Sequence, residues 1–225
     1  MSADAAATDV TGLVVAILGG TGEEGRGLAR RLAMAGQRVI IGSRSAERAA
    51  AAAAACGESL PVQGATNDEA ATQAAVVIVA VPFDGHRELL VSLAGQLAGK
   101  IVVDCVNPIG FDKRGAYALP VAEGSAAEQA AAVLPDSRVV GAFHHVSSVL
   151  LLDPEVDEID MDVLVLGDDR EATDIVQALA ARIAGMRGIY AGRLRNCAQV
   201  EALTANLVSV NRRYKAHAGL RVTDV

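Results

Sequence analysis

Apolar runs and helix-like stretches alternate along most of the 225 residues. The first run, Val14–Leu18, ends in two glycines, and a helical pattern follows from Glu23 to Ala35. Five further runs have the length and composition of strands, with helical stretches between them. The expected strands span 14–18, 38–42, 61–65, 76–81, 100–106 and 138–146, and the expected helices span 23–35, 46–55, 67–74, 83–97 and 125–134. This alternation predicts an α/β fold with a doubly wound parallel sheet, and six strands complete its Rossmann-type version.

The pattern changes after residue 150. An acidic stretch at 151–162 is expected to be a loop, and it is followed by a strand at 163–169, a helix at 171–184, a short strand at 188–192 and a long helix at 194–216. We therefore expect a flexible tail at 1–11, a nucleotide-binding domain at 12–145 and a small α/β C-terminal domain at 146–225. The C-terminal domain is too short to be independent, so we expect it to pack on the main domain and close a cleft.

Composition narrows the class of protein. Hydrophobic residues make up 52% of the chain but aromatic ones only 3%, as suits helices packed closely on a buried sheet. The net charge of −7 argues against nucleic acid or an anionic membrane as a partner. Three scattered cysteines favour a reducing compartment. With neither a signal-peptide pattern nor a long apolar run, the sequence predicts a soluble, cytoplasmic protein.

A glycine-rich turn follows the first expected strand. Gly20, Gly22 and Gly25 form the pattern G-x-G-x-x-G between a strand and a helix. In dinucleotide-binding folds these glycines permit the tight turn, the approach of a pyrophosphate to the backbone and close helix–strand packing. The helix N-terminus offers free N–H groups to phosphate. Glu23 and Glu24 suit that end of the helix dipole, and we expect their carboxylates to point outward.

The end of the second expected strand indicates which dinucleotide binds. An NAD-binding protein places an acidic residue there, about 20 residues after the turn, to hold the ribose hydroxyls. Here Ser43 and Arg44 occupy that place, with Arg48 one helical turn further on. An arginine pairs well with a 2′-phosphate, and Thr21 in the turn offers another hydroxyl. The sequence therefore predicts NADP(H).

Further candidates lie where other strands end. Pro82 and Phe83 are expected to wall the cleft, His86 to open a helix, and Asn107 to offer an amide to the nicotinamide. His144 and His145 would point to opposite faces of a strand, so they form a poor metal chelator, and no third ligand accompanies them. We expect no metal site, and one of the two histidines in the cleft.

Several stretches together resemble one known family. The stretches that carry the resemblance are the turn at 16–35, "GSR" at 42–44, "VPFDGH", "EGSAAEQ", "FHHVSS" and the closing helix at 195–214. In these stretches the chain is similar to the NADPH-dependent reductases of the deazaflavin coenzyme F420. The resemblance implies a Rossmann-type domain with a small C-terminal domain, a cleft between them, and a homodimer. It also implies hydride transfer between NADP(H) and F420, the latter as a diffusible co-substrate.

The resemblance also assigns residues. It implies that 21–24 contact the pyrophosphate, that Ser43, Arg44 and Arg48 hold the 2′-phosphate, and that His144 lies beside the deazaflavin as the catalytic residue. The remaining residues would line the nicotinamide half of the site: Pro82, His86, Ser148 and Leu203.

Two other functions stay open at this point. An NADP-dependent imine or pyrroline carboxylate reductase would need a site for the substrate carboxylate and a larger helical domain. A non-catalytic NADPH sensor would bind the cofactor without turnover.

The last expected helix carries an apolar stripe, which consists of Val200, Leu203, Leu207, Val210 and Tyr214. A stripe of this kind usually packs inward on its own sheet. Because the unit is small, we expect it to serve twice, with Leu203 near the cleft and the distal half in a two-fold contact.

Overall fold

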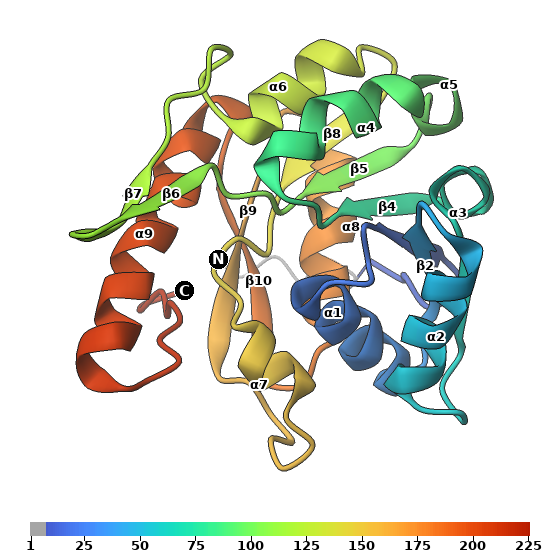
Figure 1. The fold of residues 1–225 in the computed structure, drawn as a ribbon, viewed down its shortest axis with the longest axis horizontal. Coiled ribbons are helices and arrows are strands. Elements are labelled where there is room, and N and C mark those ends of the chain that lie inside the picture. The colour runs from blue at the N-terminus through green and yellow to red at the C-terminus, as the bar shows by residue number, and fades with distance from the viewer. Residues whose placement is uncertain (1–7) are drawn as a thin grey trace.

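The computed structural model describes residues 8–225, so the first seven residues of the expected tail lie outside it. Its main sheet has eight strands in the order β10-β9-β8-β5-β4-β1-β2-β3 (Figure 1). The strands are β1 (Val14–Leu18), β2 (Arg38–Ser43), β3 (Val62–Thr66), β4 (Val76–Val79), β5 (Ile101–Asp104), β8 (Arg138–Gly141), β9 (Met161–Gly167) and β10 (Met186–Gly192). Six neighbouring strands of this sheet are all parallel and follow the expected Rossmann order: β3, β2, β1, β4, β5 and β8. This arrangement confirms the fold class.

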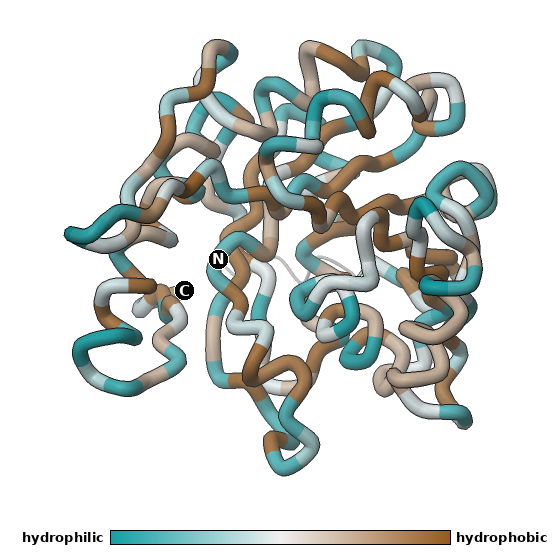
Figure 2. The backbone as a smooth tube through the Cα atoms, in the orientation of Figure 1, coloured by the Kyte–Doolittle hydropathy of each residue, from teal (hydrophilic) through white to brown (hydrophobic). Residues whose placement is uncertain are grey.

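Helices cover both faces of this sheet. They are α1 (Glu23–Met34), α2 (Ala46–Cys56), α3 (Asn67–Gln73), α4 (His86–Ser92), α5 (Ala94–Leu97), α6 (Ala126–Val133), α7 (Ser148–Leu152), α8 (Arg170–Ala180) and α9 (Cys197–Tyr214), with short 3-10 turns η1 (Phe83–Gly85) and η2 (Leu194–Asn196). Successive strand residues alternate between two cores: Val15 and Ile17 pack against α1, α2, α7 and α8, whereas Ala16 and Leu18 pack against α3 to α6 and the start of α9. Figure 2 shows the apolar residues gathered along the central strands.

The C-terminal segment continues the same sheet. Strand β9 pairs with β8 in the antiparallel sense, and β10 pairs with β9 in the parallel sense. The expected boundary near residue 146 therefore falls between two strands that are hydrogen-bonded neighbours. At the other end of the chain, Val10 is only 2% exposed, and its carbonyl accepts a hydrogen bond from Gln37 Nε2 at 3.0 Å. Val10, which lies within the expected tail, is thus attached to the core.

Three local expectations were wrong. The sixth strand ends at Gly141 rather than at 146, because Phe143 adopts a φ of 63° and turns the chain out of the sheet. The loop after residue 107 contains a hairpin of β6 (Ile109–Asp112) and β7 (Gly115–Ala118). Its turn is held by Asp112 Oδ1, which accepts from the backbone N–H of Arg114 at 2.7 Å and of Gly115 at 3.2 Å.

The third correction concerns α7, which begins at Ser148 and includes the first two residues of the expected acidic loop. This helix packs directly on α1: a Cβ on Gly27 would lie 2.6 Å from the Cβ of Leu151. The Arg31 guanidinium of α1 then donates hydrogen bonds to four carbonyls in and after α7, those of Leu150, Leu151, Asp153 and Val156, at 2.6–3.0 Å. Within residues 8–225, no helix is both long and apolar enough to cross a membrane.

Candidate cofactor-binding cleft

The glycine turn has the geometry that the sequence predicts. A Cβ on Gly25 would lie 2.5 Å from the Cα of Gly20, so the first turn of α1 packs against the loop only without a side chain. Gly20 N–H donates to the carbonyl of Gly42 at 3.1 Å, which joins the turn to β2. Gly22 is the N-cap of α1, and no side chain caps it. The first N–H groups of α1 are therefore free to bind a ligand.

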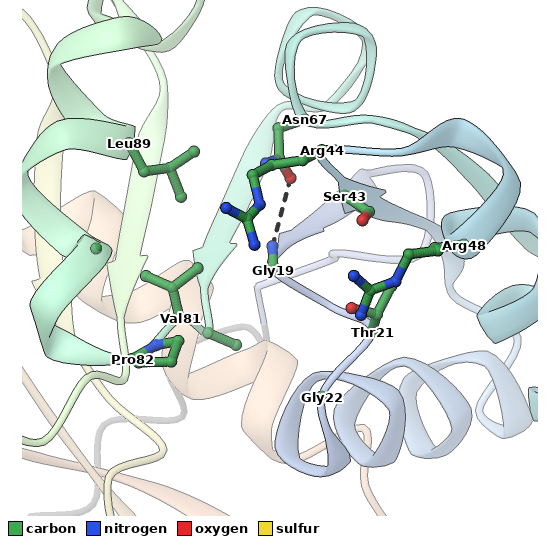
Figure 3. Close-up of a pocket in the computed structure, with 12 residues that line it drawn as sticks. Gly19, Thr21, Gly22, Ser43, Arg44, Arg48, Asn67, Val81, Pro82 and Leu89 are labelled. Atoms are coloured by element: carbon green, nitrogen blue, oxygen red, sulfur yellow. Dashed lines mark hydrogen bonds between the residues drawn. The ribbon is translucent and has the colours of Figure 1, made fainter.

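A cavity of about 400 Å³ opens above this turn (Figure 3). Thr21, Ser43, Arg44 and Arg48 all line it, and no acidic residue among positions 8–225 does. In Figure 3 the two arginines reach toward the cavity from the end of β2 and from the first turn of α2. The sequence analysis did not foresee Asn67, the first residue of α3, whose Oδ1 accepts from Gly19 N–H at 3.4 Å.

A second cavity, of about 360 Å³, is lined by Gly22, Glu23, Glu24, Gly25, Ala80, Val81, Pro82, Cys105, Val106, Asn107, Phe143, His144, Val146 and Thr204. It shares Gly22, Ala80, Val81 and Pro82 with the first cavity. The two are therefore parts of one cleft, which runs from the arginines of β2 and α2 to His144 and α9. Five expected residues line neither cavity: Gly20, Phe83, His86, Ser148 and Leu203.

Glu24 does not point outward as expected, although Glu23 is exposed. The Oε1 atom of Glu24 is buried and has no hydrogen-bond partner within residues 8–225. Burial raises the pKa of this carboxyl to about 8. At neutral pH the side chain is therefore mostly protonated, and it adds no full negative charge to the phosphate-binding turn.

The two histidines have different surroundings. His144 lines the second cavity and is 4% exposed, yet neither of its ring nitrogens has a hydrogen-bond partner in the described part of the chain. Burial lowers the pKa of His144 to about 4, so its ring is neutral at pH 7. His145 is held away from the cavity, with Nε2 at 3.0 Å from the carbonyl of Val200 on α9. His144 is thus the histidine of the cleft, although the pair lies in a turn after β8 and not on a strand.

Hydrogen bonds connect three of the residues that line the second cavity. Asn107 Nδ2 donates to the carbonyl of His144 at 2.9 Å, and Thr204 Oγ1 lies 3.2 Å from both that carbonyl and Asn107 Oδ1. Asn107 was expected in the cleft, whereas Thr204 was missed in favour of its neighbour Leu203. The sequence pattern of this helix singles out the apolar stripe, and nothing in that pattern indicates that the polar Thr204 beside it lines the cleft.

His86 has a different place from the one expected. It opens α4 but is fully buried, with Nε2 2.6 Å from Asp104 Oδ2 and Nδ1 3.0 Å from Gln129 Oε1. Burial lowers the pKa of His86, but the hydrogen bond and charge of Asp104 outweigh it, and the net pKa is raised. Asp104 Oδ1 also accepts from Val106 N–H at 3.0 Å. This buried pair fixes the loop 105–107 that walls the cleft.

Ser148 is half-buried at the start of α7, and Leu203 is half-buried on α9. Over residues 8–225, no three histidine, cysteine or acidic side chains gather in the way that a metal ion needs. The cysteines Cys56, Cys105 and Cys197 are free and buried.

Comparison with known proteins identifies close relatives. Residues 14–108 match the family model described as NADP oxidoreductase, coenzyme F420-dependent. The chain is 41% identical to the F420-dependent NADP reductase of Methanothermobacter marburgensis, over 94% of this chain and 98% of that one. It is 38% identical to the enzyme of the same name from Methanocaldococcus jannaschii, with the same coverage. A solved structure of a candidate F420-dependent NADP-reductase from Arthrobacter sp. FB24 superposes with a TM-score of 0.81 at 28% identity, over 94% of this chain and all of that one.

Proposed function

The chain belongs to the family of coenzyme F420-dependent NADP reductases, and from this premise we propose that its two connected cavities hold NADP(H) and F420 in contact. The reaction of the family is hydride transfer between these two molecules. We assign one substrate to each half of the cleft because the chemistry of the lining residues differs between its two ends. Arginines line one end, whereas the buried groups Glu24 and His144 at the other end are uncharged at neutral pH, and Glu23, which also lines that end, is exposed to solvent.

The first cavity is proposed to hold the adenosine half of NADP(H). Arg44 and Arg48 carry permanent charge and face a cavity without carboxylates, which suits a 2′-phosphate. Ser43 and Thr21 supply hydroxyls beside them. The uncapped N-terminus of α1 would take the pyrophosphate through its free N–H groups and its positive dipole end.

The nicotinamide and the deazaflavin ring are proposed to meet in the second cavity. When both are bound, NADPH supplies a hydride and F420 accepts it. The protein must hold the rings at contact distance and exclude water. Pro82, Val81 and Phe143 offer apolar walls for this, and the neutral acid of Glu24 can donate a hydrogen bond without repelling a phosphate.

His144 is proposed to act on the deazaflavin. Its neutral ring has one N–H and one free lone pair, and both nitrogens lack a partner within the described residues. It can therefore hold a proton at one nitrogen and accept a hydrogen bond at the other. Asn107 and Thr204, which bind its carbonyl, keep this ring at the wall of the cleft.

We also propose that the segment 146–225 acts as a small C-terminal domain, that it closes the cleft, and that the enzyme is a cytoplasmic homodimer with no nucleic acid partner. The three free thiols suit a reducing compartment, and the charge of −7 disfavours nucleic acid. In the apolar stripe of α9 only Val200 is buried, whereas Val210 is 36% exposed and Tyr214 73% exposed. The distal stripe is therefore available to a second copy of the chain.

The double variant Leu207→Asp/Val210→Asp tests the dimer. It is expected to give folded monomers in analytical ultracentrifugation, because a stable dimer buries more than about 1,000 Å² and two carboxylates would disrupt it. A folded dimer that carries both changes would reject this interface.

Turnover tests the activity itself. The purified protein is mixed with NADPH and F420, and the deazaflavin absorbance is followed, with FMN, FAD and a cyclic imine as alternative acceptors. F420 is expected to be reduced and the others hardly at all. Reduction of the imine without any response to F420 would reject the proposal.

A further inference from the structure

A groove of about 510 Å³ lies between the β6–β7 hairpin and the distal half of α9, outside the cleft described above. Its lining residues are Phe111, Arg114, Gly115, Ala116, Val208, Ser209, Arg212 and Arg213. In Figure 1 the hairpin lies across α9, and β7 contacts that helix. The groove therefore combines three arginines with an aromatic side chain, Phe111, that is 70% exposed.

The charge in this groove differs from that of the whole chain, which carries −7. Arg212 and Arg213 are exposed, and no acidic residue occurs between positions 202 and 223. The carboxylate nearest to Arg114 in sequence is that of Asp112, whose Oδ2 lies 3.7 Å from the arginine Nε. Asp112 Oδ1 already accepts two backbone N–H groups of the turn. The groove thus offers a positive surface to an anion.

The groove and the second cavity share two structural elements. Asn107 lines the cavity, and Phe111 lines the groove four residues later. On α9, Thr204 lines the cavity and Val208 lines the groove, about 6 Å further along the helix at 1.5 Å per residue. Arg212 lies eight residues beyond Thr204 on the same helix, about 12 Å further along, and a flexible chain attached to a ring in the cavity can span this distance.

We propose that this groove binds the anionic side chain of F420, a proposal that rests on the function given above. F420 carries its deazaflavin ring on a chain of phosphate and glutamate carboxylate groups, and Arg114, Arg212 and Arg213 match those charges. The phosphates of NADP(H) have their own cations, Arg44 and Arg48, in the first cavity. The two substrates would thus be held by separate arginine sets at opposite ends of the reaction site.

The face of α9 used here is not the one proposed for the dimer. At 100° per residue, Val208, Ser209 and Arg212 lie on the side of the helix opposite to the stripe that contains Leu207 and Val210, and Arg213 lies at the edge of that stripe, about 60° from Val210. Occupation of the groove by F420 is therefore compatible with a two-fold contact through the stripe.

The test compares F420 with the tail-less deazaflavin, which has the same ring but lacks the phosphate and glutamates. In the triple variant Arg114→Ala/Arg212→Ala/Arg213→Ala the KM for F420 is expected to rise about tenfold, the sum of three partly exposed ion pairs. The KM for the tail-less compound and for NADPH should stay unchanged, as should kcat. Arg170→Ala is the matched control, because the Arg170 side chain is 95% exposed on α8, away from the groove. For the wild type, the preference for F420 over the tail-less compound should shrink as salt is raised.

Equal KM changes for the two deazaflavins, or no change for either, would overturn the proposal. So would a change of oligomeric state in the triple variant, since the groove would then belong to a contact between copies of the chain. Failure of the proposed function has a different result, because neither deazaflavin would then be reduced even by the wild type.

Discussion

The two halves of the cleft solve different problems of recognition. The first half presents Arg44 and Arg48 at an open cavity without carboxylates. The second half presents Glu24 and His144 with buried, unpartnered polar atoms whose pKa values favour the neutral forms at pH 7. In the proposed function, the first half binds by charge. The second half is proposed to hold two rings, beside which a full charge on a buried group would be costly.

The halves also differ in how the chain builds them. Turn, strand and helix between Gly19 and Arg48 supply both arginines and half of the residues that line the charged half, and the others come from Asn67 and the segment 80–89. The neutral half is assembled from the start of α1, the segments after β4, β5 and β8, and α9, with Asn107 and Thr204 joined at 3.2 Å across 97 positions of sequence. Substitutions should therefore affect one half without the other, and four predictions use this separation.

The largest effect is expected at the buried pair behind the neutral half. His86→Ala leaves the fully buried Asp104 side chain without its hydrogen-bond partner at 2.6 Å, and breaking a buried pair of this kind costs about 3–5 kcal/mol of stability. Urea unfolding measures it. Arg87→Ala, the next residue on α4, removes an exposed pair with Glu123 and should cost under about 1 kcal/mol. Equal losses for both variants would mean that the pair contributes no more than a surface contact.

The next effect concerns the charged half. Arg44→Asp replaces the proposed ligand of the 2′-phosphate by a repelling carboxylate, and a lost charge-assisted hydrogen bond of about 3 kcal/mol corresponds to roughly a hundredfold rise in the KM for NADPH. The KM for NADH should change only a few-fold, because NADH has no 2′-phosphate. Steady-state kinetics with both cofactors decide the point, and the same loss for each would remove Arg44 from this role.

A smaller effect is expected at the deazaflavin. His144→Ala should lower kcat/KM for F420 about tenfold, the value of one hydrogen bond of roughly 1.4 kcal/mol, and should leave the Kd of NADPH nearly unchanged. His145→Ala should mainly reduce stability, because it leaves the carbonyl of Val200 without its partner. If His145→Ala had the greater effect on F420 kinetics, the roles of the two rings would be reversed.

The smallest effect is a pH dependence at Glu24. Its pKa of about 8 in the folded protein lies above the ordinary 4.5, so folding favours the protonated form. The stability contribution of this group is complete below pH 4.5 and is lost as pH rises toward 8. Above pH 8 the charged form should also raise the KM for NADPH a few-fold. Glu24→Gln should flatten both profiles, and unchanged profiles would show that Glu24 does not titrate in this range.

Sequence reasoning reached the six-stranded parallel sheet and the residues of the charged half because both depend on local patterns. The glycine spacing at 20–25 and the replacement of an acid by Ser43-Arg44 need no knowledge of distant contacts. The β6–β7 hairpin was missed because its strands are short and half-exposed, so they carry no apolar run. The positive φ of Phe143 and the burial of His86 against Asp104 depend on tertiary packing, which spacing along the chain does not encode.

The central claim, that two cofactors meet directly in one dry cleft, is tested most directly by isotope transfer. NADPH labelled with deuterium at the transferable C4 position is incubated with the protein and F420 in ordinary water, and the reduced deazaflavin is analysed by mass spectrometry. The account predicts that the deuterium is found in the reduced F420, with no loss to solvent. Reduced F420 that carries only solvent hydrogen would contradict it.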